Sequence, residues 1–408
     1  MRPSRATLSL NTAVMVLVGL PFLIPSRVAG QSPQAQQLTP PPPGNEDRTT
    51  LDFLSTSNRA AIAESSVPVL IPGTKDLTSS LSFVFEKYYY AWSSSVPEVE
   101  LSLEGSRLAY ANSPSDIVNF VFREKIRGIP GVTAASEHVL YASWQEFGAS
   151  YLLSLACTDG KDKRCASAEF LLSVADRLRY VGGGRNSNQV VLPRPAIQEN
   201  DSGSKKCSEV FQCNPPGQLV SGSGRGREDY QIYAPGIRFP IEKKPAYANS
   251  QVWGTGGLEG PKGDQCGGSN YSYPWWDNFC ETHHNYAAPM CPDKAGHQGQ
   301  DIRPPTCVKD VHPVLSVGDG KVTHHGSYTF YVTRADGTRF DYLHMSNVKL
   351  GVGTSVKKGD PVGMVSNVFD NTPTTIHLHF EIFQNISGLG FTPVPPYMSL
   401  VRSYEELK

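Results

Sequence analysis

The sequence predicts an antiparallel all-β domain in the C-terminal half, preceded by a smaller α+β domain. From about residue 312, short runs rich in strand-forming residues follow one another, and turns containing Gly separate them. The ADG at 335–337 lies between two such runs and is a hairpin signal. No helix pattern interrupts this region before the final SYEELK, whereas the N-terminal half mixes strand-like runs with one amphipathic helix pattern.

Length and charge set the broad class. The 408 residues are enough for two or three domains with buried cores. Lys and Arg together number 37 against 38 Asp and Glu, which gives a net charge of −1. A nucleic-acid-binding chain carries a basic excess or a basic stripe. We therefore expect no nucleic acid among the partners.

Residues 1–30 have the order of a cleaved export signal. Arg2 and Arg5 precede an apolar run from about Ala13 to Pro25, and the small residues of 28–30 offer a cleavage site. The apolar run is shorter than the roughly 20 residues that span a bilayer, although an uncleaved anchor is the alternative. No Cys lies near the cleavage site, which disfavours a lipoprotein anchor. We expect an exported, periplasmic protein that meets a membrane only through its cleaved signal.

Composition divides the rest of the chain into four segments. Residues 31–50 are rich in Gln, Pro and Thr, so they cannot bury a core and predict an extended spacer. Residues 51–185 are predicted to form the α+β domain. Residues 186–232 are rich in Gly, Ser and Asn and predict a linker. Residues 233–408 are predicted to form the second domain.

Local patterns predict the elements of residues 51–185. Residues 167–181 predict an amphipathic helix, because apolar residues beginning with Phe170 and Val174 recur at spacings of three and four. The segment Asp116 to Ile126 predicts a short helix. No constellation of reactive side chains is present, and the one histidine, His138, is interpreted as structural. Three runs are rich in strand formers: Leu81 to Trp92, Val99 to Leu103 and His138 to Ala156.

All 8 Cys lie downstream of the signal, and an even number in an exported chain favours disulfides. The sequence does not fix their connectivity, and pairing of neighbours is one hypothesis, in which one bridge closes a small loop in the linker. A Cys-ligated structural zinc is the rival interpretation, but no spacing is CxxC and an oxidising compartment disfavours thiolates. The hypothetical pairs are Cys157–Cys165, Cys207–Cys213, Cys266–Cys280 and Cys291–Cys307.

A candidate metal site lies in GHQGQD at 296–301, DYLHM at 341–345 and IHLHFEIF at 376–383, which hold four of the 10 His. A catalytic zinc site typically uses three protein ligands and leaves a fourth position for water. The candidates suffice for three ligands, and two imidazoles remain for proton transfer or oxyanion stabilisation. These candidates are His297, Asp301, His344, His377 and His379.

Strand periodicity makes the HLH segment informative. Side chains in a strand alternate between its two faces, so His377, His379 and Glu381 share one face while apolar residues fill the other. Core packing explains the apolar face but not two neighbouring imidazoles, for which a solvated polar face is the alternative. Glu381 either orients an imidazole from outside the ligand set or is an ordinary surface residue.

His297 and Asp301 fall in a loop-like stretch. Gly299 between them lets the backbone turn sharply, so both side chains can converge on one ion. A helical spacing is the alternative, which Gly299 and the following Arg-Pro-Pro disfavour. The His pairs at 283–284 and 324–325 would point to opposite faces of a strand, so neither forms an obvious two-ligand site.

The order of these elements, HxGxD followed by YLH and then HLHFE, resembles the lysostaphin-type (LytM-domain) zinc endopeptidases, peptidoglycan-cleaving enzymes with an antiparallel β fold. The resemblance covers roughly residues 285–400. The HLHFE element is complete, whereas the family's GxHxGxD element lacks its first Gly and appears as KAGHQGQD at 294–301. Two further departures are Cys307 and Asp310 in place of a short turn, and VFDNTPTTI in place of a Gly-rich approach to HLH.

By position, the resemblance implies that His297, Asp301 and His379 bind one Zn2+ per chain, and that His377 and His344 form the catalytic pair. One Asp and two neutral His leave zinc an open position and a net charge of +1, so the pKa of a bound water falls towards about 7. His377, beside His379 on the same strand face, is the expected general base. His344 is expected to stabilise the oxyanion, although the two could exchange roles.

The resemblance further implies a zinc metalloendopeptidase that hydrolyses peptide bonds in the stem or cross-link peptides of peptidoglycan. Two other functions stay open. One is a catalytically silent binding module that activates other cell-wall hydrolases, which the presence of all five residues disfavours. The other is a peptidase of proteins or small peptides. The N-terminal domain would regulate access to the site or bind a regulatory protein.

Overall fold

The computed structural model describes residues 32–96, 98–111, 122, 124–184, 212–282 and 287–407. The predicted signal at 1–30, Cys207 and the His pair at 283–284 lie outside these described residues. In the described part of the chain, no helix is both long and apolar enough to cross a membrane.

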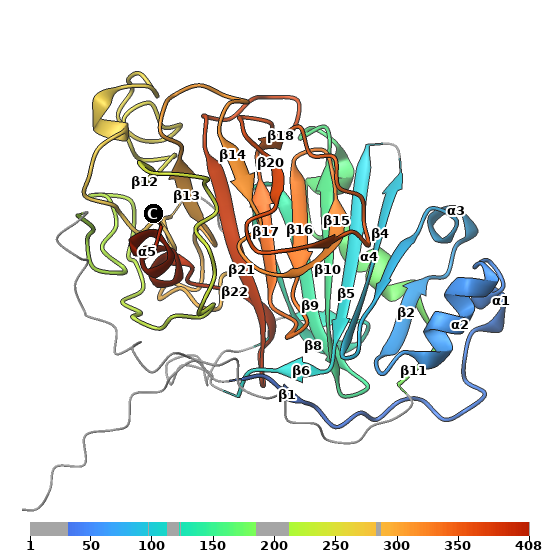
Figure 1. Ribbon diagram of the computed structural model, residues 1–408. Helices are drawn as coiled ribbons and strands as arrows, with labels where there is room; N and C mark the ends of the chain where they lie inside the picture. The colour runs from blue at the N-terminus through green and yellow to red at the C-terminus, as the bar shows by residue number, and fades with distance from the viewer. Residues whose placement is uncertain are drawn as a thin grey trace, which may run out of the picture.

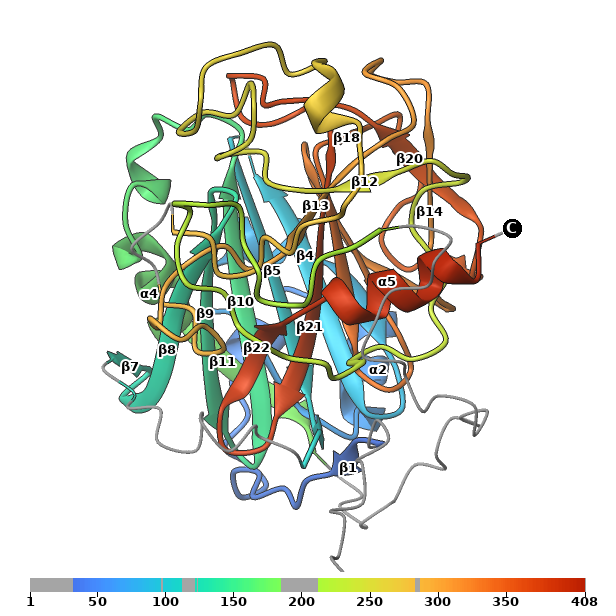
Figure 2. The ribbon, with the colours of Figure 1, turned by 90° about the vertical axis from the view of Figure 1, so that its left-hand side faces the viewer.

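The C-terminal domain is built from two antiparallel sheets, which confirms its predicted all-β class. Between residues 287 and 407, the one α-helix is α5 (Tyr397–Glu405), on the side that faces the viewer in Figure 2. The larger sheet has the order β12 (Tyr247–Ala248), β13 (Gln300–Arg303), β21 (Leu378–Ile386), β17 (Arg339–Leu343), β16 (Thr329–Thr333), β15 (Gly320–His325) and β19 (Ser355–Val356), and β22 (Gly390–Val394) also pairs with β21. The smaller sheet consists of β14 (Pro313–Leu315), β20 (Pro361–Val365) and β18 (Met345–Ser346).

The described residues of the N-terminal domain form a second large antiparallel sheet, a small two-stranded sheet, four short α-helices and one further strand pair. The large sheet has the order β3 (Ser82–Phe85), β4 (Tyr89–Val96), β5 (Val99–Ser106), β10 (Ala149–Cys157), β9 (Val139–Glu146), β8 (Ile129–Ser136) and β7 (Glu124–Ile126). The small sheet pairs β11 (Leu178–Gly183) with β2 (Pro68–Pro72), and the helices are α1 (Arg48–Leu51), α2 (Thr56–Glu64), α3 (Lys75–Thr78) and α4 (Glu169–Asp176).

Two predicted helices differ in the structure. The helix expected over 167–181 ends at Asp176, because Leu178 begins β11 and pairs with Pro72 of β2. Leu178 is therefore buried as a strand residue. Ile126, at the end of the other predicted helix, lies in β7 and pairs with β8, while most of that segment lies outside the described residues.

The expected spacer also differs. Gln34 and Ala35 form a short strand, β1, which pairs with β6 (Leu108–Ala109). Leu38 is buried in the core of the N-terminal domain. The segment from residue 32 onward therefore lies against the domain, because its few apolar side chains find partners that its overall composition does not reveal.

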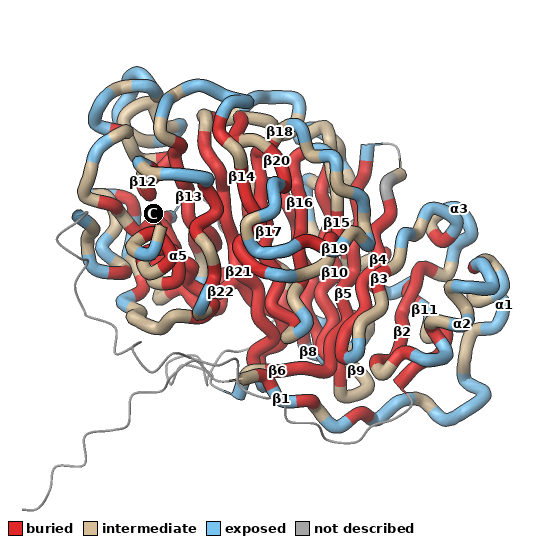
Figure 3. The backbone as a smooth tube through the Cα atoms, viewed as in Figure 1, coloured by how far each residue is buried: buried red, intermediate tan, exposed pale blue. Residues whose placement is uncertain are grey.

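The two large sheets face each other and share a core (Figure 1). Tyr141 of β9 packs edge-on against Phe383 of β21, with ring centroids 5.1 Å apart. Tyr89 of β4 donates a hydrogen bond to the carbonyl of Thr333, at 3.2 Å. In Figure 3, buried positions run through the strands of both sheets, and exposed positions gather in the loops. The contact between the domains is therefore part of the hydrophobic core.

The disulfides correct half of the predicted pairing. Cys157–Cys165 forms as predicted. Cys266 pairs with Cys307, and Cys280 pairs with Cys291, in place of the predicted Cys266–Cys280 and Cys291–Cys307. The two observed bridges are nested, so that Cys266 reaches Cys307 from outside the Cys280–Cys291 loop. The predicted Cys207–Cys213 pair involves a residue outside the described part of the chain.

Candidate metal and catalytic site

The register of the C-terminal sheet brings the predicted residues together. Asp301 of β13 lies directly opposite His379 of β21, and Leu343 of β17 lies opposite His379 on the other side. His344 follows Leu343 with a φ of 66°, a left-handed conformation that is uncommon outside functional sites and turns. His297 precedes β13. Three neighbouring segments of one sheet therefore supply the predicted site.

Three donor atoms form a triangle of the size that a metal ion requires. His297 Nε2 lies 3.0 Å from His379 Nδ1, and Asp301 Oδ1 lies 2.9 Å from His379 Nδ1 and 3.6 Å from His297 Nε2. Ligands about 2.0 Å from a tetrahedral zinc ion are about 3.3 Å from one another. The two imidazole nitrogens would repel each other unless a proton or a cation lay between them. The donor set therefore fits a zinc ion.

Each of these three side chains uses its second polar atom in a hydrogen bond to the protein, as is typical of metal ligands. His297 Nδ1 donates to the carbonyl of Asn278 at 3.0 Å, and His379 Nε2 donates to Glu381 Oε1 at 3.0 Å. Asn278 Nδ2 donates to Asp301 Oδ2 at 2.7 Å. Metal-binding histidines typically donate their second ring N–H to a carbonyl or carboxylate, which directs the other nitrogen to the ion. Glu381 is fully buried, so the surface interpretation is wrong.

The backbone at Gly299 lies so close to His379 that there is no room for a side chain. A Cβ atom there would collide with the imidazole of His379 and would lie 2.9 Å from the carbonyl oxygen of Phe380. The backbone bends at Gly299, as expected, although its φ is outside the left-handed region. Any side chain at this position would displace His379 from the donor triangle.

His377 and His344 lie beside the triangle with their ring nitrogens fixed. His377 Nδ1 donates to the carbonyl of Thr375 at 2.8 Å, which leaves Nε2 facing Asp301 Oδ1 at 3.6 Å. His344 Nδ1 donates to the carbonyl of Val368 at 2.9 Å, which leaves Nε2 facing the site. The two rings are 4.7 Å apart. Each imidazole can therefore exchange a proton at Nε2 with a group bound between them.

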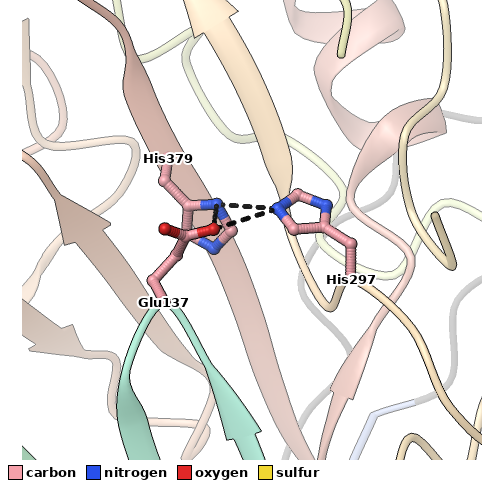
Figure 4. Close-up of side chains that lie close together, drawn as sticks. All are labelled: Glu137, His297 and His379. Carbon is pink, nitrogen blue, oxygen red and sulfur yellow. Dashed lines mark hydrogen bonds and ion pairs between the residues drawn. The ribbon is translucent and has the colours of Figure 1, made fainter. Parts of the chain in front are cut away.

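A residue of the N-terminal domain also enters the site. Glu137, between β8 and β9, forms a candidate metal-binding group with His297 and His379 (Figure 4). Its Oε1 atom lies 3.7 Å from His297 Nε2 and 3.9 Å from His379 Nδ1. Its Oε2 atom lies 3.3 Å from His344 Nε2. No local sequence signal marks Glu137, because only the packing of the two domains brings it to the histidines.

Burial and charge set the protonation of the site. Burial lowers the pKa of His377 to about 3, which keeps it neutral. Burial also acts to lower the pKa of His379, but the hydrogen bonds to Asp301 and Glu381 outweigh it and raise this pKa well above the usual range. Burial acts to raise the pKa of Glu137, but the neighbouring His344 and His379 hold it well below the usual range. Burial likewise acts to raise the pKa of Asp301, but the neighbouring histidines hold it below its usual range. Glu137 and Asp301 are therefore ionised and attract positive charge, and a metal ion that binds here takes the place of the proton on His379 Nδ1.

Three other histidines considered in the sequence, His324, His325 and His138, are not part of the donor triangle. His324 is buried between the sheets, where its Nδ1 lies 2.8 Å from Ser93 Oγ. His325 follows it in β15, and the pair contributes nothing to the site, as expected from strand alternation. His138 has a structural contact as predicted, because its Nδ1 atom lies 3.1 Å from Asp370 Oδ2, although it lies in a turn and not in a strand.

Comparison with known proteins identifies the segment that carries the site. Residues 295–389 match the sequence model of peptidase family M23, which confirms the resemblance to the lysostaphin-type peptidases. This segment is therefore an M23 peptidase domain, and it contains all five predicted site residues. Glu137 lies outside it.

Solved structures of similar proteins include three peptidases. A putative glycyl-glycine endopeptidase lytM from Ruminococcus gnavus is 29% identical over 28% of this chain and 48% of its own length, with a TM-score of 0.24. The catalytic domain of the antimicrobial peptidase lysostaphin from Staphylococcus simulans is 23% identical over 33% of this chain and 94% of its own, with a TM-score of 0.25. The deep-sea M23 metalloprotease Pseudoalterin is 18% identical over 38% and 73%, with a TM-score of 0.23. The chain spans about half the length of the Ruminococcus gnavus protein.

Proposed function

We propose that this protein is a zinc-dependent endopeptidase whose metal ligands are His297, Asp301 and His379. The observation that supports this most strongly is the donor triangle with edges of 2.9 to 3.6 Å. Asn278 and Glu381 hold the second polar atoms of these residues, so the free donor atoms point inward without rearrangement. Such preorganisation is what a metal site of defined geometry needs.

The chain's own residues supply the remaining parts of a hydrolytic reaction. A zinc ion, when bound, lowers the pKa of water and polarises a carbonyl group. His377 Nε2 is free to accept a proton, because the Nδ1 proton is held by the carbonyl of Thr375. His344 is placed to donate from Nε2 to a developing oxyanion once protonated there, because its Nδ1 proton is likewise held by the carbonyl of Val368. His377 is therefore assigned as the base and His344 as the oxyanion donor.

We take the substrate to be a peptide of peptidoglycan, in its stems or cross-links. The resemblance to the lysostaphin-type endopeptidases supplies this class, and an M23 peptidase domain is consistent with it. The three disulfides of the described residues are typical of proteins from oxidising compartments. Together with the predicted signal, they support export to the periplasm, where peptidoglycan is accessible.

A digest of purified peptidoglycan tests this function. The full-length chain is compared with a C-terminal part separated after cleavage at a protease site inserted between residues 195 and 196. Bound zinc is measured first in each form, and released muropeptides are then identified by mass spectrometry with zinc present or chelated. We expect new muropeptides that depend on zinc and on His377. Zinc-loaded protein that releases none in either form would contradict the function, and cleavage of a protein substrate alone would favour the general peptidase.

A further inference from the structure

We propose that Glu137 is a fourth metal ligand and that the N-terminal domain thereby holds the full-length chain in a latent state. The inference rests on the proposed metal site. A catalytic zinc ion has three protein ligands, and water occupies the fourth corner of the tetrahedron around it. In this chain a carboxylate from another domain lies at that corner (Figure 4).

The two carboxylate oxygens of Glu137 have separate partners. Oε1 lies 3.7 Å from His297 Nε2 and 3.9 Å from His379 Nδ1. These distances exceed the separation of about 3.3 Å between neighbouring ligands of a tetrahedral zinc ion by about 0.6 Å at most. Oε2 lies 3.3 Å from His344 Nε2, the atom assigned to stabilise an oxyanion. Hydrolysis of a peptide bond also generates a carboxylate in this position. Glu137 therefore occupies the site as a product carboxylate would.

The turn that carries Glu137 adopts an unfavourable backbone conformation. Glu137 and His138 are the two turn residues between β8 and β9, and their φ values are 47° and 60°. Such turns favour Asn-Gly, because most other residues are destabilised in the left-handed region. Strain of this kind persists where surrounding contacts enforce it and often marks a functional site.

Contacts on both sides of the turn hold Glu137 in place. Gln298, next to His297, donates from Nε2 to the carbonyl of Ala135 at 2.8 Å. His138 Nδ1 lies 3.1 Å from Asp370 Oδ2, and the imidazole ring packs on the ring of Phe369. The C-terminal domain thus binds the turn before and after Glu137. The position of Glu137 beside the metal site is therefore a fixed feature of the interface between the domains.

Two physical consequences make this state inactive. The side chains of the five predicted residues are at most 2% exposed, so a polymer substrate cannot reach them. Glu137 and Asp301 together neutralise the two positive charges of a zinc ion, which removes the net charge that activates water. The β8–β9 turn must withdraw before the enzyme can act, so the N-terminal domain serves as the regulator of access.

Azide binding to the cobalt-loaded full-length chain tests this inference independently of substrate. Co2+ in place of zinc gives a visible spectrum, and azide changes it only when a coordination position is open. Glu137→Gln keeps the side-chain shape, and Glu137→Gly removes the carboxylate while relieving the backbone strain. Glu100→Gln is the matched control, because Glu100 also crosses the domain interface, accepting from the backbone N–H of Ser327 at 2.6 Å, but away from the site.

We expect no azide response in the wild type or in Glu100→Gln, and a saturable response in both Glu137 variants. The dissociation constant for Co2+ should also rise at least about tenfold in the Glu137 variants. A wild-type chain that binds both Co2+ and azide would overturn latency and leave the metal site intact. An equal azide response in Glu100→Gln would show that loosening of the interface, and not loss of a ligand, opens the site. A chain that binds no Co2+ would remove the metal site and the latency together.

Discussion

Asp301 and His379 are direct partners across the β13–β21 ladder, and Asp301 Oδ1 lies 2.9 Å from His379 Nδ1. The pairing of two strands therefore sets the geometry of two metal-binding groups. A slip of one residue in the register would move His379 to the opposite face of the sheet. The hydrophobic face of β21, fully buried at Leu378 and Phe380, prevents such a slip.

Removal of either of two neighbouring histidines should separate metal binding from turnover. His379→Ala removes a corner of the donor triangle and should abolish stable zinc retention. His377→Ala leaves the triangle whole and should keep zinc, while kcat falls by about 10²–10⁴-fold for loss of a general base. Zinc content by mass spectrometry measures the first effect, and muropeptide release by the C-terminal part separated after cleavage measures the second. Loss of zinc from His377→Ala would show that this division of roles is wrong.

Glu381 should control metal affinity without touching the metal. Its Oε1 atom accepts from His379 Nε2 at 3.0 Å, and its Oε2 atom accepts from the hydroxyl of Tyr141 at 3.2 Å. Glu381→Gln should raise the dissociation constant for zinc by about 10–100-fold, because His379 loses the carboxylate that orients it. Competition with a chelator of known affinity measures the change. Glu405→Gln, on α5, is the control, and an equal loss there would contradict this role.

The Cys280–Cys291 disulfide should support both stability and metal binding. It closes a loop with a sequence separation of 11, for which chain entropy gives about 3 kcal/mol. The backbone N–H of Cys280 also donates to the carbonyl of His297 at 2.7 Å. Replacing both cysteines by Ala should lower Tm and weaken zinc binding.

The Cys157–Cys165 disulfide provides the matched control. Its separation of 8 closes a similar loop in the N-terminal domain, outside the segments that carry His297, Asp301 and His379. Its removal should lower Tm with little change in zinc affinity. Thermal unfolding and chelator competition on both double variants make the comparison, and equal losses of zinc affinity would exclude a local role for Cys280–Cys291.

A buried carboxyl group at the domain interface should make stability depend on pH. Burial raises the pKa of Glu104 to about 7, and the Thr333 hydroxyl donates to it at 3.2 Å. The folded state therefore binds a proton more tightly than the unfolded state, so stability falls as pH rises from about 4.5 to 7. The loss reaches about 3 kcal/mol at most. Asp341, whose pKa burial raises to about 8, adds a slope of the same sign.

Glu104→Gln should flatten this dependence, because the amide does not ionise. Chemical unfolding at pH 5 and pH 8 measures the free energy difference in the variant and the wild type. Glu86→Gln is the control, since Glu86 also bridges the domains, through Lys321 at 2.7 Å, but is partly exposed. An unchanged slope in Glu104→Gln would show that this carboxyl group is ionised in the folded protein at neutral pH.

The local part of the site could be predicted from sequence, and the part made by packing could not. Strand alternation places His379 and Glu381 on one face, and their contact at 3.0 Å follows from that pattern. Glu137 has no such pattern, because it reaches the site only after two sheets pack together. The Cys266–Cys307 bridge was missed for a similar reason, since an irregular chain carries no periodicity that fixes which residues meet.

X-ray absorption at the zinc edge tests the central claim most directly, because it reports the atoms that surround the ion. With about one zinc per full-length chain, the account predicts two imidazole nitrogens at about 2.0–2.1 Å and carboxylate oxygens at about 2.0–2.2 Å. His297→Ala should lose one imidazole contribution or the zinc itself. Sulfur ligands at about 2.3 Å, or an unchanged spectrum in His297→Ala, would contradict the assignment of His297, Asp301 and His379 as the metal site.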